Sequence, residues 1–114
     1  MQRVMLAIFA MLAIVISTQH AMAADADAEA ERGRALAQRL CANCHMNPGQ
    51  GEKSGPSGIP SFSAVAKRPE QTFDGIVIWL QSIPPMMPNH HLSRDEMEAL
   101  AAFILSLRTP DAQG

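Results

Sequence analysis

Two thiols and an imidazole lie within five residues, in the segment Cys41-Ala42-Asn43-Cys44-His45. This C-x-x-C-H spacing is the attachment sequence of c-type haem. In a tight helical turn the two thiols stand one turn apart, so each can add to one haem vinyl group, and the next residue then projects its imidazole at the iron. The spacing therefore predicts one covalent haem c on Cys41 and Cys44, with His45 as an axial ligand.

Three other roles for the cysteine pair stay open at this point. A thioredoxin-like redox pair needs a strand before it, whereas here a helical pattern precedes it. A zinc site shared with His90 and His91 would lack a second paired-ligand motif and would ignore the adjoining His45. In an exported protein the two thiols could also oxidise to a disulfide. We favour haem attachment over all three.

A second group of soft ligand atoms lies in the segment 84–91, "PPMMPNHH", which holds two thioethers and two imidazoles among three prolines. Met and His are common residues, and a proline-rich segment is usually only a connector. The segment taken alone therefore assigns no ligand.

The first 23 residues have the pattern of a secretory signal. An unbroken apolar run of 13 residues, 4–16, follows the single cation Arg3, and Ala21 and Ala23 supply the small residues before a cut. The run is shorter than the roughly 20 residues that cross a bilayer. We expect cleavage after Ala23 and export to the periplasm, with an uncleaved membrane anchor as the alternative.

The remaining residues, 24–114, form one domain with a net charge of −3, because Arg3 is the only charged residue that is lost. Proteins that bind nucleic acid carry a basic patch, so the negative net charge argues against this function. The chain is also short and poor in aromatics, so it buries little surface of its own. We expect a bound group to fill part of its centre.

Helical periodicity accounts for most of this domain. It predicts a helix over 28–40 that runs into Cys41, a short helical turn over 61–66, and a helix from Glu70 or Thr72 to Gln81. Between the first two, residues 47–60 have the Gly, Pro and Ser of a loop.

The last helix has the clearest start. Ser93 and Glu96 form a capping box, the stripe behind it is apolar, and Pro110 ends it. Arg108 lies at the negative end of the helix dipole. No segment alternates with period two for long enough to be a strand, so the predicted fold class is all-α.

With these elements in order, the chain resembles class I monohaem cytochromes c, in particular small bacterial ones. The resemblance covers nearly all of residues 24–114. It lies in a first helix entering "CANCH", then "GIPSF", a Trp-containing helix, "PPMMPNHHLS", and a last helix ending "LAAFILSL". It implies the cytochrome c fold, in which three to four helices wrap around one haem.

The resemblance also implies the second axial ligand. In this family a Met on a proline-flanked loop before the final helix binds the iron opposite the His. Counting back from Leu92-Ser93 places Met87 at that position. Met86 is the main alternative ligand, and His90 or His91 are weaker alternatives.

Further contacts are implied by the same resemblance. A Pro carbonyl beyond the attachment loop accepts a bond from the ligating His, and "GIPSF" matches it at Pro60, with Pro56 as the competitor. Phe62 and Trp79 are expected to pack on the haem, and Gly33 is expected to face Phe103 where the first and last helices cross.

His/Met ligation fills both axial positions, so the expected protein is an electron carrier and not an enzyme. The expected donors are a dehydrogenase or a bc-type complex, and the expected acceptors are an oxidase or a reductase. It is expected as a monomer or, alternatively, as the tightly bound haem subunit of a periplasmic oxidoreductase complex.

Overall fold

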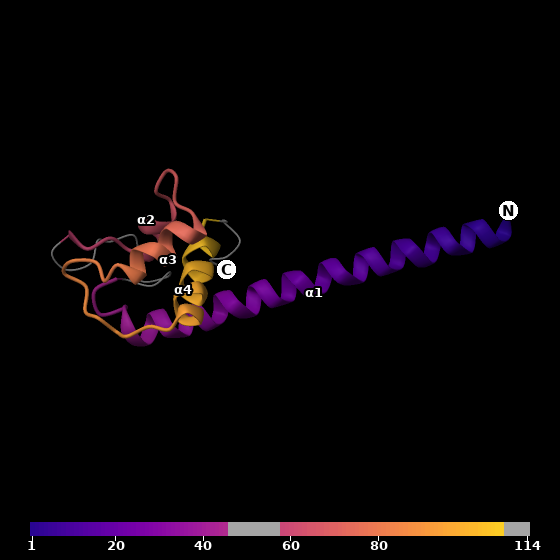
Figure 1. Cartoon of the computed structure of the whole chain (residues 1–114). Helices are drawn as coiled ribbons and strands as arrows, with labels where there is room; N and C mark the ends of the chain where they lie inside the picture. Colours follow the sequence, from indigo (N-terminus) through magenta and orange to yellow (C-terminus); the bar gives the residue numbers. More distant parts are fainter. Residues whose placement is uncertain (46–57, 109–114) are drawn as a thin grey trace.

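A computed structural model of the chain describes residues 1–45 and 58–108. These residues form four helices: α1 (Gln2–Leu40), α2 (Phe62–Ala66), α3 (Phe73–Gln81) and α4 (Arg94–Ser106), which Figure 1 shows in chain order. The described residues contain no strand. The predicted all-α fold class is confirmed.

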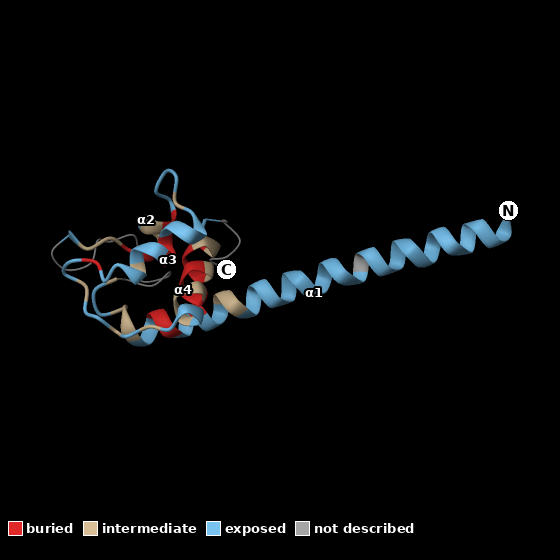
Figure 2. Cartoon of the chain, in the orientation of Figure 1, coloured by how far each residue is buried: buried red, intermediate tan, exposed pale blue. Residues whose placement is uncertain are grey.

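Helix α1 is much longer than the helix predicted over 28–40, because residues 2–27 continue it toward the N-terminus without a break (Figure 1). The N-terminal part of α1 projects away from the other helices and is exposed to solvent (Figure 2). Among the described residues, α1 alone is long and apolar enough to cross a membrane, a test that secretory signals also pass. Cleavage after Ala23 stays a prediction.

The last turns of α1 cross α4, and this crossing forms the centre of the core. Gly33 is buried there, and a β-carbon built on it would lie 1.9 Å from the carbonyl oxygen of Ala99 and 2.8 Å from Cβ of Phe103. Only glycine therefore permits the two backbones to come this close. The expected juxtaposition of Gly33 and Phe103 is present.

The core gathers around this crossing from all four helices (Figure 2). Phe103 and Val77 are its largest fully buried side chains. The other buried apolar residues are Leu36, Ala37, Phe62, Ala66, Ile76, Ala99, Leu100, Ala101, Ile104 and Leu107.

The two short helices begin at hydroxyl caps. The Ala64 N–H donates to Ser61 Oγ over 3.1 Å at α2, and the Gly75 N–H donates to Thr72 Oγ1 over 3.0 Å at α3. Each hydroxyl satisfies an amide that has no partner within its helix. The predicted bounds 61–66 agree with the structure to within one residue; for α3 the predicted start at Thr72 agrees equally well, whereas the alternative start at Glu70 is three residues too early.

Helix α4 carries the predicted capping box. The Glu96 N–H donates to Ser93 Oγ over 3.2 Å, and the Ser93 N–H donates to Glu96 Oε2 over 2.8 Å. The bond from the Ser93 amide is the main reason that the pKa of Glu96 is lowered. The helix ends at Ser106, and Pro110, the predicted stop, lies outside the described residues.

Candidate haem site

The C-x-x-C-H segment continues α1 as one tight turn. The Cys41 N–H donates to Ala37 O over 2.9 Å, and the amides of Cys44 and His45 both donate to Cys41 O, over 3.1 and 2.8 Å. Each thiol thus stands one turn from the other, as the addition to two vinyl groups requires. Cys41 is half-buried against the core, Cys44 is exposed, and both thiols are free. Burial raises the pKa of the Cys41 thiol, and the nearby Cys44 raises it further.

The imidazole of His45 is oriented by a carbonyl fifteen residues further along the chain. Its Nδ1 lies 2.7 Å from the carbonyl oxygen of Pro60. A carbonyl can only accept, so this contact assigns the proton to Nδ1 and leaves the lone pair of the neutral ring on Nε2. The ring therefore has one nitrogen committed to the protein and the other able to bind a metal. Pro56, the competing residue, lies outside the described residues.

A buried aromatic ring supports His45 from a second direction. Phe62, the first residue of α2, stacks on the imidazole with ring centres 5.4 Å apart and an angle of 28° between the planes. The same phenyl ring meets Phe103 of α4 edge-on at 5.6 Å. The phenyl ring therefore connects the imidazole to the core.

The methionine loop distinguishes its two thioethers. A turn closes where the Met87 N–H donates to Pro84 O over 3.2 Å, and the Met87 side chain is half-buried. Met86 has a φ of 71° and is 100% exposed. Of the two histidines, His90 is half-buried and His91 is exposed. Of the two thioethers, that of Met87 is therefore the less exposed to solvent.

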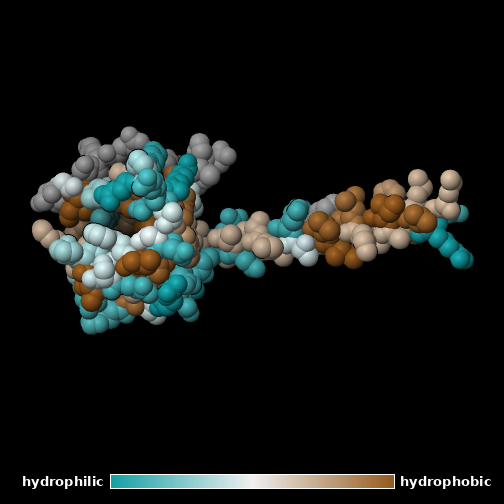
Figure 3. All heavy atoms as spheres, turned by 45° about the horizontal axis from the view of Figure 1, so that its top comes forward, coloured by the Kyte–Doolittle hydropathy of each residue, from teal (hydrophilic) through white to brown (hydrophobic). Residues whose placement is uncertain are grey.

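Helix α3 presents apolar side chains on more than its buried face. Ile76 and Val77 are buried in the core, whereas Ile78 is 63% and Trp79 is 56% exposed. Figure 3 shows hydrophobic residues reaching the surface of the globular part between hydrophilic ones. Ile78 and Trp79 therefore leave two large apolar side chains exposed on α3, next in sequence to its buried residues.

The donor chemistry of these residues fits haem c. Two thiols one turn apart, an imidazole with Nε2 available and a half-buried thioether are the groups that a c-type haem needs for attachment and axial ligation. Cys41, Cys44 and His45 come from the end of α1, and Met87 comes from the loop before α4.

One contact near the site was missed by the sequence reasoning. The guanidinium of Arg108 donates from Nε to the Ala66 carbonyl over 2.6 Å and from an Nη to the Gln71 carbonyl. The sequence predicts only an interaction of Arg108 with the dipole of α4. No local pattern could indicate these bonds, because their acceptors lie 42 and 37 residues away.

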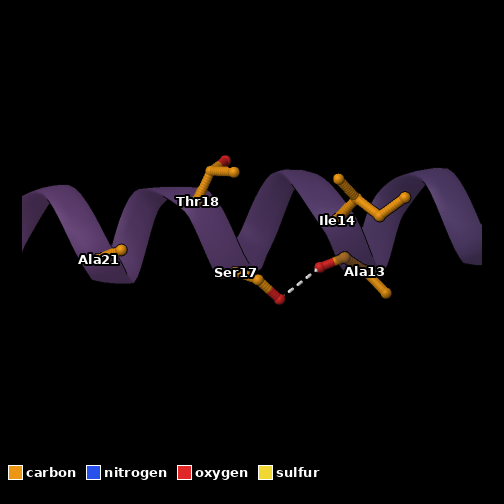
Figure 4. Close-up of a pocket in the computed structure, with 5 residues that line it drawn as sticks. All are labelled: Ala13, Ile14, Ser17, Thr18 and Ala21. Carbon is orange, nitrogen blue, oxygen red and sulfur yellow. Dashed lines mark hydrogen bonds between the residues drawn. The ribbon is translucent and has the colours of Figure 1, made fainter.

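A shallow groove lies on the N-terminal part of α1, far along the helix from the C-x-x-C-H turn. It is lined by Ala13, Ile14, Ser17, Thr18 and Ala21 (Figure 4). Ser17 Oγ donates to the Ala13 carbonyl of the same helix over 2.9 Å, so its hydroxyl is already satisfied.

An all-α fold whose first helix ends in a C-x-x-C-H turn and crosses its last helix through a glycine defines a c-type cytochrome. The comparison with protein families agrees. Residues 28–104 match the family described as cytochrome c oxidase, cbb3-type, subunit III. The match covers more than half of the chain, so the protein belongs to this cytochrome c family, whose members carry haem c and transfer electrons.

One relative among the curated proteins supports the same class. Cytochrome c-552 of Bradyrhizobium diazoefficiens is 39% identical over 97 residues, which cover 85% of this chain and 88% of the relative. No solved structure matches the chain significantly.

Proposed function

We propose that this protein is a periplasmic carrier of single electrons, with one covalent haem c whose iron is bound axially by His45 and Met87. The observation that carries the proposal is the contact between His45 Nδ1 and the Pro60 carbonyl at 2.7 Å. The contact occupies Nδ1, so that Nε2 is the nitrogen left to bind iron, and it raises the basicity of Nε2.

The second ligand follows from the methionine loop. Met87 is half-buried where Met86 is wholly exposed, and Pro84 and Pro88 stiffen the chain on both sides. An imidazole and a thioether together leave the iron no open position for a substrate. When bound in this way, haem supplies a one-electron couple whose potential the thioether raises. We therefore assign electron transfer and no enzymatic reaction.

The protein surface around the site suits a group that is partly covered. Phe62 holds the imidazole from one side, while Trp79 and Ile78 of α3 offer exposed apolar contacts. Trp79 is proposed to pack on the haem, as the resemblance implies.

The leader and the charge support an exported protein that meets redox partners in the periplasm. Residues 1–23 are proposed to be cut off after Ala23, which leaves a domain with a net charge of −3. The proposed donors are a dehydrogenase or a bc-type complex, and the proposed acceptors are an oxidase or a reductase. A partner with a basic rim would associate faster at low than at high ionic strength.

A second candidate function makes the chain a bound haem subunit of a periplasmic oxidoreductase complex. Two apolar residues near Met87 favour it, since Ile83 is 52% and Met86 is 100% exposed. A single-sized monomer after native extraction supports the free carrier. Copurification with a large redox subunit at constant stoichiometry supports the complex.

An alkaline-pyridine haem spectrum combined with the intact mass of exported protein tests the proposal. We expect a c-type haem spectrum and the mass of residues 24–114 plus one haem. Colourless protein whose mass equals its polypeptide alone, from cells that mature other c-type cytochromes, would reject it.

A further inference from the structure

We propose that Arg108 is a positioning residue for the proximal ligand, and that its two bonds to the α2–α3 connection hold the Pro60 carbonyl against His45. The proposal rests on His45 being an iron ligand, as argued above. The observations that carry it are the bonds of one guanidinium to the carbonyls of Ala66 and Gln71.

The first bond replaces one that α2 cannot make for itself. Ala66 is the last residue of α2, so its carbonyl would accept from the Glu70 amide if the helix continued. The chain turns away instead, since Pro69 disfavours a helical conformation at Arg68 and Glu70 has a φ of 63°. Arg108 Nε supplies the missing donor over 2.6 Å.

The second bond fastens the other end of the same connection. Gln71 directly precedes Thr72, the cap of α3, and its carbonyl accepts from an Nη of Arg108. The Gln71 side chain also returns to the Val65 carbonyl over 3.4 Å. A planar guanidinium can donate in parallel to two fixed carbonyls, whereas a lysine ammonium has no such fork.

Helix α2 transmits this restraint to the site. Its far end holds Phe62, which stacks on His45 at 5.4 Å, and Pro60 lies two residues earlier. A helix of five residues is a single short unit, so its C-terminal end cannot shift without moving its N-terminal end. Arg108 and Phe103 thus attach the two ends of α2 to the last helical segment of the chain.

The consequence concerns the electron density of the imidazole. A bond from Nδ1–H to a carbonyl makes the ring a stronger donor to the metal and favours the oxidised state. Loosening α2 would lengthen that bond and favour the reduced state. The effect is on the ligand, so it is separable from general loss of stability.

Two substitutions test this. R108K keeps the positive charge and loses the fork, and R108Q loses both. The measurements are the reduction potential, the deuterium exchange rate of the His45 Nδ1 proton by NMR, and the urea midpoint. In both variants we expect exchange to become about tenfold faster. We also expect the redox equilibrium to shift about threefold toward the reduced form, which is about 28 mV at 59 mV per tenfold change.

The matched control is S93A, which removes the α4 cap at the end far from α2. It should lower the urea midpoint while leaving exchange and potential as they are. Equal shifts in S93A, or unchanged values in R108K, would overturn the proposal. If neither Arg108 variant accumulates, the exchange rate of the Arg108 Nε proton in the wild-type protein decides: the proposal expects its bond to the Ala66 carbonyl to slow this exchange, and exchange as fast as in an unbonded guanidinium rejects it.

These outcomes are distinct from a failure of the proposed function. Wild-type protein without covalent haem would remove the function and this inference together. Haem-loaded wild type with an indistinguishable R108K would remove this inference alone.

Discussion

Gly33 of α1 lies directly against the backbone of Ala99 in α4, where a β-carbon would stand 1.9 Å from the Ala99 carbonyl oxygen. To make room for a β-carbon, a backbone atom of α4 would have to move. Helix α1, which ends in the attachment turn, can therefore pack against α4 only because residue 33 has no side chain.

Gly33→Ala should accordingly destabilise the protein. Overpacking costs about 1 to 3 kcal/mol, and a β-carbon 1.9 Å from a backbone oxygen belongs to the upper part of that range, about 2 to 3 kcal/mol, whereas the gain in helix propensity is about 1 kcal/mol. We expect a net loss of about 1 to 2 kcal/mol in the free energy of unfolding, measured by urea titration of the haem protein.

Gly75→Ala is the control for this substitution. A β-carbon at Gly75 would meet the hydroxyl of Thr72 at 2.9 Å and Oε1 of Gln71 at 4.0 Å, and both atoms belong to side chains that can rotate. Rotation of Thr72 would lose the cap of α3, which costs about 1 kcal/mol, and alanine at position 75 would gain about 1 kcal/mol in helix propensity. The two effects should nearly cancel. A Gly33→Ala protein as stable as Gly75→Ala would mean that the two helices do not pack this closely.

Met87→Ala should abolish the weak near-infrared absorption band of Met-ligated ferric haem, because it removes the proposed sulfur ligand. Met86→Ala should keep the band, since that side chain is 100% exposed, and should change stability by less than about 0.5 kcal/mol. If the band is lost in Met86→Ala and kept in Met87→Ala, the axial ligand is Met86 and not Met87.

Met87→His should lower the reduction potential, because an imidazole stabilises ferric iron more than a thioether does. We expect a decrease of at least about 59 mV, which is tenfold in a one-electron equilibrium. Redox titration against mediators measures it. An unchanged potential would show that the side chain at position 87 never touches the iron.

Stability should depend on pH through Glu96. Its pKa lies below the ordinary value of 4.5, first because of the bond from the Ser93 amide. A carboxyl whose pKa is lower in the folded than in the unfolded state binds fewer protons when folded. Its contribution is therefore complete well above pH 4.5 and is lost as the pH falls through the folded-state value.

Glu96→Gln tests this contribution, because the amide keeps the shape of the capping box without the charge. Its urea midpoint should lie below that of the wild type at pH 7, and the difference should shrink as the pH falls below 4.5. A difference that stays constant across this range would contradict the assignment.

Much of the local structure could be predicted because its determinants lie within three or four residues of one another. The turn at Cys41, Cys44 and His45 is a matter of spacing, and the capping box of Ser93 and Glu96 joins groups three positions apart. Such bonds depend on the local backbone alone. Hence the fold class, the attachment turn and the start of α4 could all be predicted from the residue types and their spacing along the chain.

The contacts that orient the site belong to the folded chain. The Pro60 carbonyl reaches His45 across fifteen residues, and Arg108 reaches Ala66 across 42. The resemblance to a known family pointed to the first of these, and nothing pointed to the second. A hydrogen bond between distant segments requires that packing first bring its two groups within about 3 Å, in the right direction. Residue order determines which groups exist, whereas the crossing of α1 with α4 and the seating of α2 determine which of them meet.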